Sequence, residues 1–394
     1  RSTLFPYTTL FRSSYNNVNT AIDTATRTYK AVHFKAIPLA SSDWGTITCT
    51  RDGFDGTDIV APSDPLCPGD VIFLNAQATT DHEFIQWGFD PYDVPQTVFV
   101  MPNSGKDLTV YGYFGPKSYW KDTVKTQPTG FRTDYNSNLH ISDSLQLAWL
   151  ISLSNGLNGV QAHTFFYDTV FLAGGTYDMS AHLWTPLGTS QHPFMGVLMP
   201  EPGSSVIIKG IIVNEPGMAS VGFFGHLDSA TVQDITLQKS HFVGQQYVGA
   251  LAGESTNSKL TNITVQDESS LEQSANNLTT MITAIYASGG LIGNSVKDTI
   301  ENNAVAALYM GATIYNGGMV GHATDVKASN TWTWSKPRMS SLYSGGAFGY
   351  SSGSTFDTLQ PSASAAKSRG GSQIVNCYVH YDNPDGKVTR AGGL

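Results

Sequence analysis

Gly289-Gly-Leu-Ile-Gly293 is the clearest copy of a short glycine-bounded motif that returns through the C-terminal half of the chain. The first copy is Gly222-Phe-Phe-Gly225, and Gly392-Gly-Leu394 reads as the opening of a further one. Successive copies close at steps of 28, 40, 28 and 28 residues. The closing glycines are Gly225, Gly253, Gly293, Gly321 and Gly349.

A second motif is an Asp or Asn that stands nine residues after the closing glycine, between two apolar residues. A fixed period of this length indicates a stacked array, in which each unit buries its apolar face against its neighbours. Short alternating runs punctuated by glycine are typical of strands. The second motif supplies Asp234, Asn262, Asn302, Asn330 and, after an insertion, Asn376.

The two motifs together predict an all-β chain built around a parallel β-solenoid, with about one coil per repeat and ~4.8 Å between coils. We expect the apolar residues to point inward and the glycines to allow positive φ or close backbone approach at corners. Asp and Asn suit corners because both tolerate the left-handed region. Their side chains could bridge neighbouring coils. A flexible glycine-rich linker is the alternative, and the regular apolar pairs argue against it.

The motifs also resemble the GLUG repeat. The resemblance rests on Gly289-Gly-Leu-Ile-Gly293 together with Thr-Asn-Ile-Thr-Val (261–265) and Asn376-Cys-Tyr-Val379, and it covers residues 139–394. It implies a right-handed parallel β-helix of the kind found in bacterial surface and secreted proteins, including adhesins and some IgA-specific metallopeptidases. A shared fold leaves the function of the surface open.

One helix is predicted before the repeats. Asp143 suits the N-cap with Gln146 three residues later, and Gly156 suits the C-terminal cap. The intervening residues, from Leu145 to Leu153, are apolar almost all round, which favours burial. Because an open first coil carries unpaired backbone groups, we expect residues 139–220 to form a cap helix and the first irregular coils, with regular repeats over 221–394.

Residues 28–115 alternate apolar and polar positions between turn-rich clusters, which predicts a small β module. Pro68-Gly-Asp-Val71, Phe84-Ile-Gln-Trp87 and Phe99-Val-Met-Pro102 resemble the internalin-type B repeat. That resemblance implies a β-grasp-like spacer on a secreted or surface protein. Residues 116–138 are expected to form a polar linker.

The first thirteen residues, Arg1 to Ser13, resemble an in-frame translation of a sequencing-library adapter. Such a segment is excluded from fold reasoning, and residues 1–27 are expected to be this scar and a loose leader. Because the sequence also ends inside a repeat, we expect the chain to be part of a longer protein.

The composition of the chain argues against several classes of partner and of binding site. The net charge is −9 and only 13% of residues are charged, which argues against nucleic acid or an anionic membrane as partner. No apolar run is long enough to span a bilayer. The cysteines (Cys49, Cys67 and Cys377) are too few for a disulfide framework or a zinc site. Cys49 and Cys67 could form one disulfide or remain as thiols.

Three stretches of the sequence partly match catalytic or metal-binding motifs, and none of the matches is complete. His82-Glu83 starts like a zinc-peptidase helix, but Gln86 stands where the second histidine belongs. Gly349-Tyr-Ser-Ser-Gly353 matches a nucleophile elbow in letters only, because its first glycine closes a repeat. Asp52, Asp55 and Asp58 have the wrong spacing for a calcium loop and predict a solvated turn. No cofactor is expected.

One surface feature is a candidate for binding. In the fourth coil the repeat register directs Ala328, Thr331 and Thr333 inward, which leaves Trp332 and Trp334 on the outer face. Two exposed tryptophans on one side of a strand would form a flat platform for a glycan or a partner protein. A register slip of one residue would bury both instead.

These observations predict a non-catalytic bacterial surface or secreted protein, adhesin-like, that presents a solenoid to a glycan or to a host or matrix protein. A carbohydrate-active β-helix enzyme, a polysaccharide lyase or hydrolase, is the first alternative. Carboxylates converging in an open groove would favour it. A purely structural stalk is the second alternative.

Overall fold

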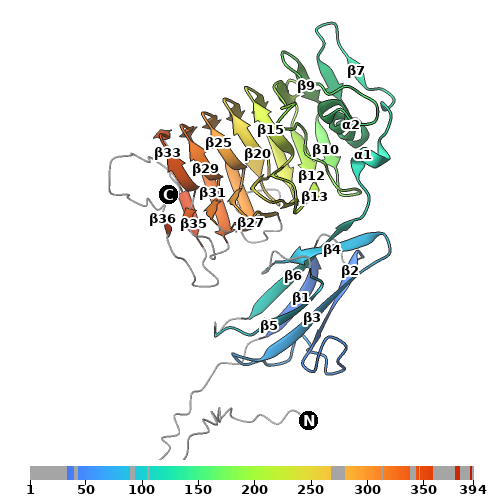
Figure 1. Ribbon diagram of the computed structural model, residues 1–394, viewed down its shortest axis with the longest axis vertical. Coiled ribbons are helices and arrows are strands. Elements are labelled where there is room, and N and C mark those ends of the chain that lie inside the picture. The colour runs from blue at the N-terminus through green and yellow to red at the C-terminus, as the bar shows by residue number, and fades with distance from the viewer. Residues whose placement is uncertain are drawn as a thin grey trace, which may run out of the picture.

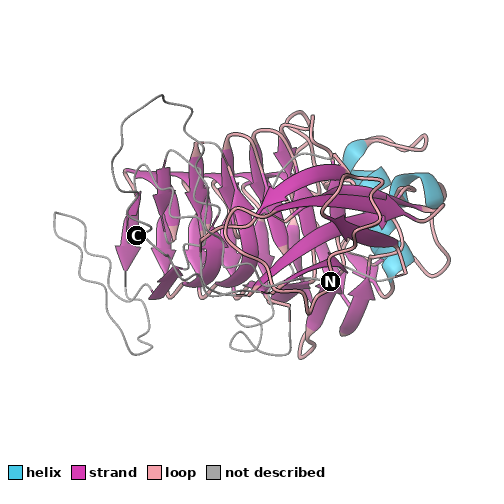
Figure 2. Ribbon diagram, turned by 90° about the horizontal axis from the view of Figure 1, so that it is seen from below, coloured by secondary structure: helices cyan, strands magenta, loops and turns pink. Residues whose placement is uncertain are grey.

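The computed structural model describes residues 33–39, 43–88, 94–103, 107–267, 280–312, 314–337, 343–345, 347–357, 378–381 and 391–392. The described chain is mostly β. Its larger part is a stack of parallel strands, with two helices at one end and a smaller β module beside it (Figure 1). Figure 2 shows the strands of the stack side by side along its length.

Over the described residues, four sheets run along the stack, and all but one of their strand pairs are parallel. The first contains β10 (Gly175–Asp178), β12 (Val206–Lys209), β13 (Ile212–Asn214), β17 (Ile235–Gln238), β18 (His241–Val243), β22 (Thr264–Val265), β23 (Met281–Thr283), β27 (Ala304–Gly311), β31 (Trp332–Pro337) and β35 (Tyr378–Tyr381). The second contains β7 (Arg132–Thr133), β8 (Leu139–Ile141), β9 (Thr169–Leu172), β11 (Val197–Pro200), β16 (Thr231–Gln233), β21 (Lys259–Thr261), β26 (Thr299–Glu301), β30 (Lys327–Ser329) and β34 (Thr355–Asp357).

The other two sheets carry the glycine motif. The third contains β14 (Ser220–Val221), β19 (Tyr247–Gly249), β24 (Ala287–Gly289), β28 (Tyr315–Gly317), β32 (Tyr343–Gly345) and β36 (Ala391–Gly392). The fourth contains β15 (Phe224–Asp228), β20 (Ala252–Thr256), β25 (Ile292–Val296), β29 (Val320–Thr324) and β33 (Phe348–Ser352).

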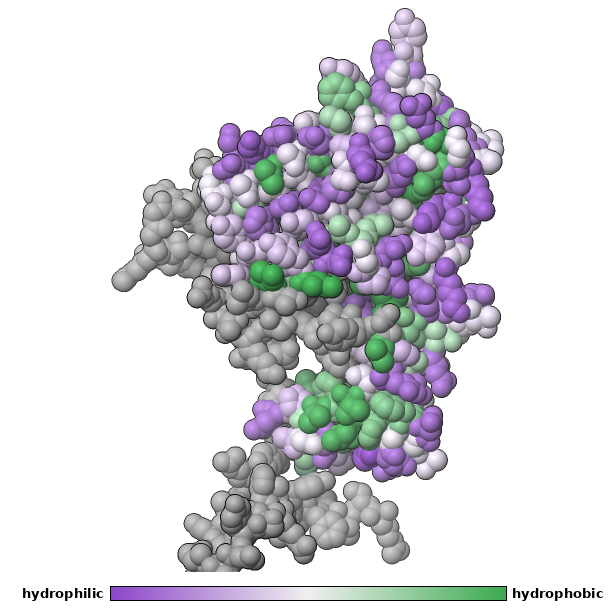
Figure 3. All heavy atoms as spheres, in the orientation of Figure 1, coloured by the Kyte–Doolittle hydropathy of each residue, from purple (hydrophilic) through white to green (hydrophobic). Residues whose placement is uncertain are grey.

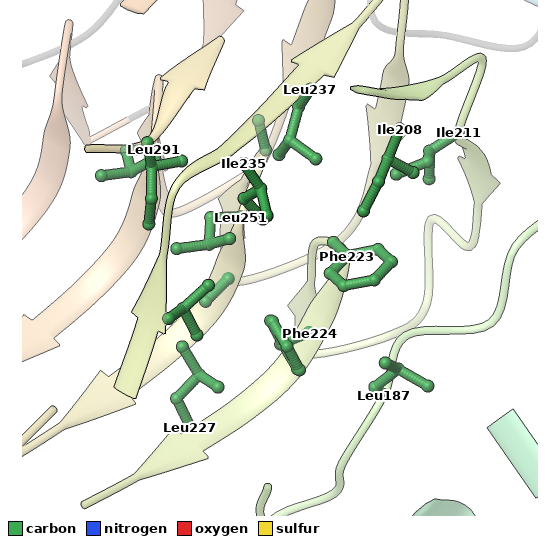
Figure 4. Close-up of a cluster of buried hydrophobic side chains, with 14 of the residues drawn as sticks. Leu187, Ile208, Ile211, Phe223, Phe224, Leu227, Ile235, Leu237, Leu251 and Leu291 are labelled. Carbon is green, nitrogen blue, oxygen red and sulfur yellow. The ribbon is translucent and has the colours of Figure 1, made fainter. Parts of the chain in front are cut away.

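Equivalent residues of successive repeats lie one above another. Val232 pairs with Leu260, Leu260 with Ile300, and Ile300 with Ala328, and all four side chains are buried. Ile235, Leu237, Leu251 and Leu291 belong to the same core, and Figure 4 shows them directed into the space between the sheets. Such in-register stacking is compatible with the predicted β-helix, because each coil supplies both apolar contacts and backbone partners to the next.

The predicted helix is α2 (Ser144–Asn155). The Asp143 carboxylate accepts a hydrogen bond from the backbone N–H of Gln146 at 2.8 Å, and Gly156 ends the helix at φ 68°. Most of the helix is buried, but Leu145 is 50% exposed, so the expected burial all round is wrong at this position. Leu145 lies in the first turn, away from the core that Leu147 and Leu150 enter.

A second helix, α1 (Trp120–Thr123), lies inside the segment expected to be a linker. Trp120 is buried in the same core as α2, and its indole N–H donates to the carbonyl of Met179 at 2.9 Å. The two helices lie at the end of the stack that carries β7 and β8 of the second sheet (Figures 1 and 2). Trp120 therefore attaches the segment 116–138 to the stack.

The N-terminal module has two small sheets. One contains β1 (Phe34–Leu39), β6 (Leu108–Pro116) and β4 (His82–Trp87), with β1 and β6 parallel. The other is antiparallel and contains β2 (Gly45–Thr50), β3 (Val71–Ala78) and β5 (Gln96–Val100). Figure 3 shows an apolar area on this module. Val71, Val98 and Val100 are exposed on its strands β3 and β5.

The module packs on the first sheet of the stack. Ile85 and Tyr113 share a small buried cluster with Ile212, Val243 and Met281. Two polar contacts join the same surfaces. The Gln86 amide donates to the Thr283 hydroxyl at 3.0 Å, and the Asn214 amide donates to the Glu83 carboxylate at 2.9 Å.

Candidate binding face

A column of tyrosines runs along the outside of the third sheet. Tyr247, Tyr315 and Tyr343 each begin a strand two residues before the first glycine of the motif, and Tyr247 and Tyr315 both pair with Ala287 of β24. Tyr286, which immediately precedes Ala287, continues the column across that rung. We call these four residues and the neighbouring column described next the tyrosine face.

The rings of the column contact one another from rung to rung. Ring centroids are 5.5 Å apart between Tyr247 and Tyr286, 5.4 Å between Tyr286 and Tyr315, and 5.3 Å between Tyr315 and Tyr343. The first two pairs are edge-to-face and the third is stacked. Each phenol is partly exposed. The arrangement fixes the rings as a continuous aromatic surface, because each ring restricts the rotation of the next.

A parallel column lies beside it on the fourth sheet. It consists of the residue that follows each closing glycine, and neighbouring members pair in register. Its members are His226, Glu254, Asn294, His322 and Tyr350. Tyr315 joins the two columns, with its ring 5.2 Å from that of His322 and 5.4 Å from that of Tyr350.

Hydrogen bonds hold the polar members of the second column. The His322 ring nitrogen Nδ1 lies 3.0 Å from the Asn294 amide oxygen, and Tyr350 stacks on His322 with centroids 4.9 Å apart. The Glu254 carboxylate accepts a hydrogen bond from the Ser220 hydroxyl. These contacts orient amide, imidazole and carboxylate groups toward the outside of the sheet.

Burial shifts the pKa values of histidines and tyrosines on this face in the direction that favours their neutral forms. It lowers the pKa of His226, against the opposing effect of Glu254, and it lowers the pKa of His322. It raises the pKa of Tyr247 and Tyr315. Because desolvation disfavours the charged form of each group, both imidazoles and both phenols are neutral near pH 7.

The closing glycines bring the two columns together. A Cβ on Gly293 would lie 2.4 Å from the backbone nitrogen of Val248, and one on Gly349 would lie 2.5 Å from the carbonyl oxygen of Gly321. Neither glycine has positive φ, so the motif serves close backbone approach rather than an unusual backbone angle. The same holds at Gly225, Gly253 and Gly321.

The Asp and Asn residues at the corners, unlike the closing glycines, do have positive φ. Asp234, Asn262, Asn302 and Asn330 have φ values between 54° and 59°, in the left-handed region. The Asn262 amide donates to the Asp234 carboxylate at 2.7 Å, and the Asn330 amide donates to the Asn302 amide oxygen at 2.6 Å. Asn376 lies outside the described residues.

The structure describes one of the two tryptophans of the predicted platform. Ala328, Thr331 and Thr333 are buried, so the repeat register is the expected one. Trp332 is partly buried and packs against the cluster between the stack and the N-terminal module. The side chain of Trp334 lies outside the described part of the structure. Trp332 thus borders the module, on a different sheet from the tyrosine face.

Two carboxylates converge at a separate site. His140 bridges them, with Nδ1 2.6 Å from Glu201 and Nε2 3.4 Å from Asp134. Glu201 also lines a shallow pocket of about 340 Å³ with Asp234 and Asn262. Hydrogen bonds from Asn138 and from backbone N–H groups lower the pKa of Asp134 to about 2. A carboxyl with this pKa is ionised and cannot act as a general acid near neutral pH.

The other sequence motifs have structural roles. His82 and Glu83 lie on strand β4, and Gln86 contacts the stack. Gly349 to Gly353 runs through β33 into a turn that is followed by β34, without the helix that an elbow requires. The Asp52 carboxylate accepts from the backbone N–H groups of Thr57 and Asp58, as in a solvated turn.

The described residues do not contain the features of a metal site, a disulfide or a membrane-spanning helix. They contain no group of three His, Cys, Asp or Glu side chains placed to hold a metal. Cys49 is buried and Cys67 half-buried, and both are free thiols. No helix in this part of the chain has the length and apolar character needed to cross a membrane.

The chain is similar to one protein of known structure at low identity. That crystal structure is titled a "putative immunoglobulin A1 protease" from Bacteroides ovatus. The identity is 14% and the TM-score 0.34, and the match covers 62% of this chain and 85% of the other. No protein-family model and no curated protein sequence matches the chain. A likeness of this size assigns neither a fold nor an activity.

Proposed function

We propose that this chain is a non-catalytic, adhesin-like bacterial protein, secreted or held at the cell surface, that binds glycans through the tyrosine face. The proposal includes a right-handed parallel β-helix of GLUG type, preceded by an internalin B-repeat-like spacer. In-register pairing of residues 28 or 40 apart in the sequence supports the β-helix. Among the described residues, the module docks on the first sheet and not on the third or fourth, which supports ligand binding at those two sheets.

The observation that carries the binding role is the continuous contact of the tyrosine rings from Tyr247 to Tyr343. Rings in fixed orientation present apolar faces without a large loss of side-chain freedom on binding. Sugar rings have an apolar face of C–H groups and a rim of hydroxyls. The aromatic column suits the first, and the polar column of Glu254, Asn294 and His322 suits the second.

The test is glycan binding by the whole chain and by Tyr315→Ala. Tyr315 contacts Tyr286, Tyr343, Tyr350 and His322, so its removal interrupts both columns. We expect the variant to lose at least about tenfold in affinity. Tyr135→Ala is the matched control, because Tyr135 is fully exposed and distant in the fold from the third sheet.

Equal glycan binding by the Tyr315→Ala variant and the parent chain would contradict the proposal. A chain that binds purified matrix protein, but no glycan, would move the function to protein adhesion. Circular dichroism spectra of both variants should match that of the parent, since Tyr315 is partly exposed and lies outside the buried core.

A second candidate, hydrolysis of a polysaccharide, has one observation in its favour. Asp134 and Glu201 flank His140 beside a pocket. Hydrolysis needs one protonated carboxylic acid, and hydrogen bonding keeps the pKa of Asp134 at about 2. Release of reducing sugar by the parent chain, abolished by Glu201→Gln, would establish this alternative. A chain that neither cleaves nor binds would be a structural stalk.

A further inference from the structure

We propose that the tyrosine face selects uncharged glycan chains and holds them along the stack axis, across several rungs. This inference rests on the proposed function and specifies its ligand. It is argued from the charge of the face, from the direction of its columns and from the hydrogen-bonding groups beside the rings.

The face has no fixed cation among its described strands. The strands of the third and fourth sheets contain no Lys or Arg, and their acidic residues are Asp228 and Glu254. Sulfated and uronic glycans are recognised by Arg and Lys, which supply charge-assisted hydrogen bonds. An anionic chain on this face would meet two carboxylates instead, so like charge disfavours it.

The histidines do not replace the missing cations. His226 and His322 are partly buried on the face, and burial lowers the pKa of each. A neutral imidazole carries one donor and one acceptor. In His322 the Nδ1–H donates to the Asn294 amide oxygen, so Nε2 remains as an acceptor for a ligand. The Asn294 amide and the Glu254 carboxylate add further donors and acceptors in the same column. Hydroxyl groups both donate and accept, so they match this set.

The columns also set the direction and length of the ligand. Residues of a column belong to successive rungs, so the aromatic contacts run across the strands and along the stack. Four rungs, from Tyr247 to Tyr343, span about 14 Å at the usual strand spacing of ~4.8 Å. A monosaccharide covers only part of that length. A chain of several sugars can contact every ring.

The experiment measures affinity for matched glycans by titration calorimetry with the whole chain. Neutral di-, tetra- and octasaccharides of glucan, mannan and galactan are compared with oligogalacturonates and heparin fragments of the same lengths. We expect one neutral series to bind at least about tenfold tighter than the acidic ligands. Within that series the affinity should rise by about tenfold or more from disaccharide to tetrasaccharide.

Ionic strength gives an independent readout. Binding of an uncharged chain should change little as salt is raised, because screening acts on charge pairs. In a second variant, Glu254→Lys, the face gains a cation and loses an anion. Its affinity for oligogalacturonate should increase, while Tyr135→Ala should show no change for any ligand.

The outcomes separate the two proposals. Tight, salt-sensitive binding of acidic glycans that Tyr315→Ala abolishes would overturn this inference and leave the tyrosine face as the binding site. Neutral binding that does not depend on chain length would overturn the axial placement. Neutral binding that Tyr315→Ala leaves intact, or no glycan binding at all, would overturn the proposed function itself.

Discussion

The imidazole of His241 packs against the ring of Tyr113, with ring centroids 4.4 Å apart, where the N-terminal module meets the stack. His241 is buried, and neither of its ring nitrogens has a hydrogen-bond partner. Burial lowers its pKa from 6.5 to about 3. The docked arrangement therefore requires a neutral imidazole.

Acid should weaken the docking of the module. A depressed histidine pKa stabilises the docked state fully above pH 6.5, and this stability is lost as the pH falls toward 3. We expect small-angle scattering to show expansion of the parent chain in this window. The His241→Leu variant should resist that expansion, because it has no proton to accept. His192→Leu, at an exposed position, is the control.

Other ionisable groups line the same joint. They are Glu83 on β4, Tyr113 on β6, Tyr119 and Glu215. Burial, with a smaller contribution from the charge of Glu215, raises the pKa of Tyr119 to about 12, so this phenol stays neutral throughout the acid window. If the His241→Leu variant expands at the same pH as the parent, protonation of His241 is not the cause of the expansion and its role at the joint is excluded.

Gly321→Ala should destabilise the stack. The new Cβ would lie 2.8 Å from the carbonyl oxygens of Gly293 and Ser288, which are backbone atoms and cannot move aside freely. Overpacking of this kind costs about 1–3 kcal/mol. A matched change, Gly217→Ala, meets no atom within 4 Å and should leave the melting temperature unchanged or slightly raised. Similar melting temperatures for both variants would show that rungs can shift to admit a methyl group.

Substitutions at Asn262 should separate backbone conformation from hydrogen bonding. Asn262 has φ 54°, and its amide donates to the Asp234 carboxylate at 2.7 Å. Asn262→Gly removes only the hydrogen bond, at about 1 kcal/mol. Asn262→Ala adds the left-handed strain, about 1–2 kcal/mol more. Urea midpoints should therefore fall in the order parent, Gly variant, Ala variant, and a reversed order for the two variants would refute this assignment.

A carboxylate at the same corner should make stability depend on pH. In Asn262→Asp a second acidic group faces Asp234, so like charges repel at neutral pH. We expect the urea midpoint of this variant to recover toward that of the parent as the pH falls below about 4, where one carboxyl is protonated. A pH-independent difference from the parent would mean that repulsion is not the cause.

Burial of Asp298 should make the stability of the fold depend on pH in the opposite direction to burial of His241. Asp298 is fully buried, accepts from the Ser258 backbone N–H at 2.7 Å and from the Ser295 hydroxyl at 2.6 Å, and burial raises its pKa from 3.8 to about 6. The stability supplied by its protonated form is full below pH 3.8 and is lost as the pH rises through 6.

The test compares Asp298→Asn with the parent across that range. The parent should lose on the order of 3 kcal/mol relative to the variant between the two pH values, because each pKa unit corresponds to about 1.4 kcal/mol. Asp325→Asn, at an exposed corner with positive φ, serves as control. Parallel stability curves for the parent and Asp298→Asn would show that Asp298 keeps an ordinary pKa.

Much of the local structure follows from residue patterns. The capping pair Asp143 and Gln146, the terminal Gly156 and the Asn corners each act through their own backbone or a near neighbour. A second left-handed corner, which includes Asn257, Lys297 and Gly353, was not predicted. Its residue types differ from rung to rung, so no single pattern marks it.

The candidate site was predictable only in part. A tyrosine stands two or three residues before the last four of the five glycine motifs, at 247, 286, 315 and 343, and that spacing is a usable signal. Trp332 and Trp334 are the more conspicuous signal, because two tryptophans stand in one strand. No local pattern indicates that Trp332 packs against a cluster containing Ile85 and Tyr113, more than 200 residues away in the chain.

The period of the repeat, the inward residues such as Val232 and Leu260, and the corners follow from residue types alone, because each depends on residue type at a fixed short spacing. Which outer columns meet follows only from the folded stack. Tyr315 contacts His322, seven residues later, and Tyr350, thirty-five residues later, because the closing glycines let adjacent strands approach closely. Contacts of that kind depend on the stacking of whole coils, which no local pattern encodes.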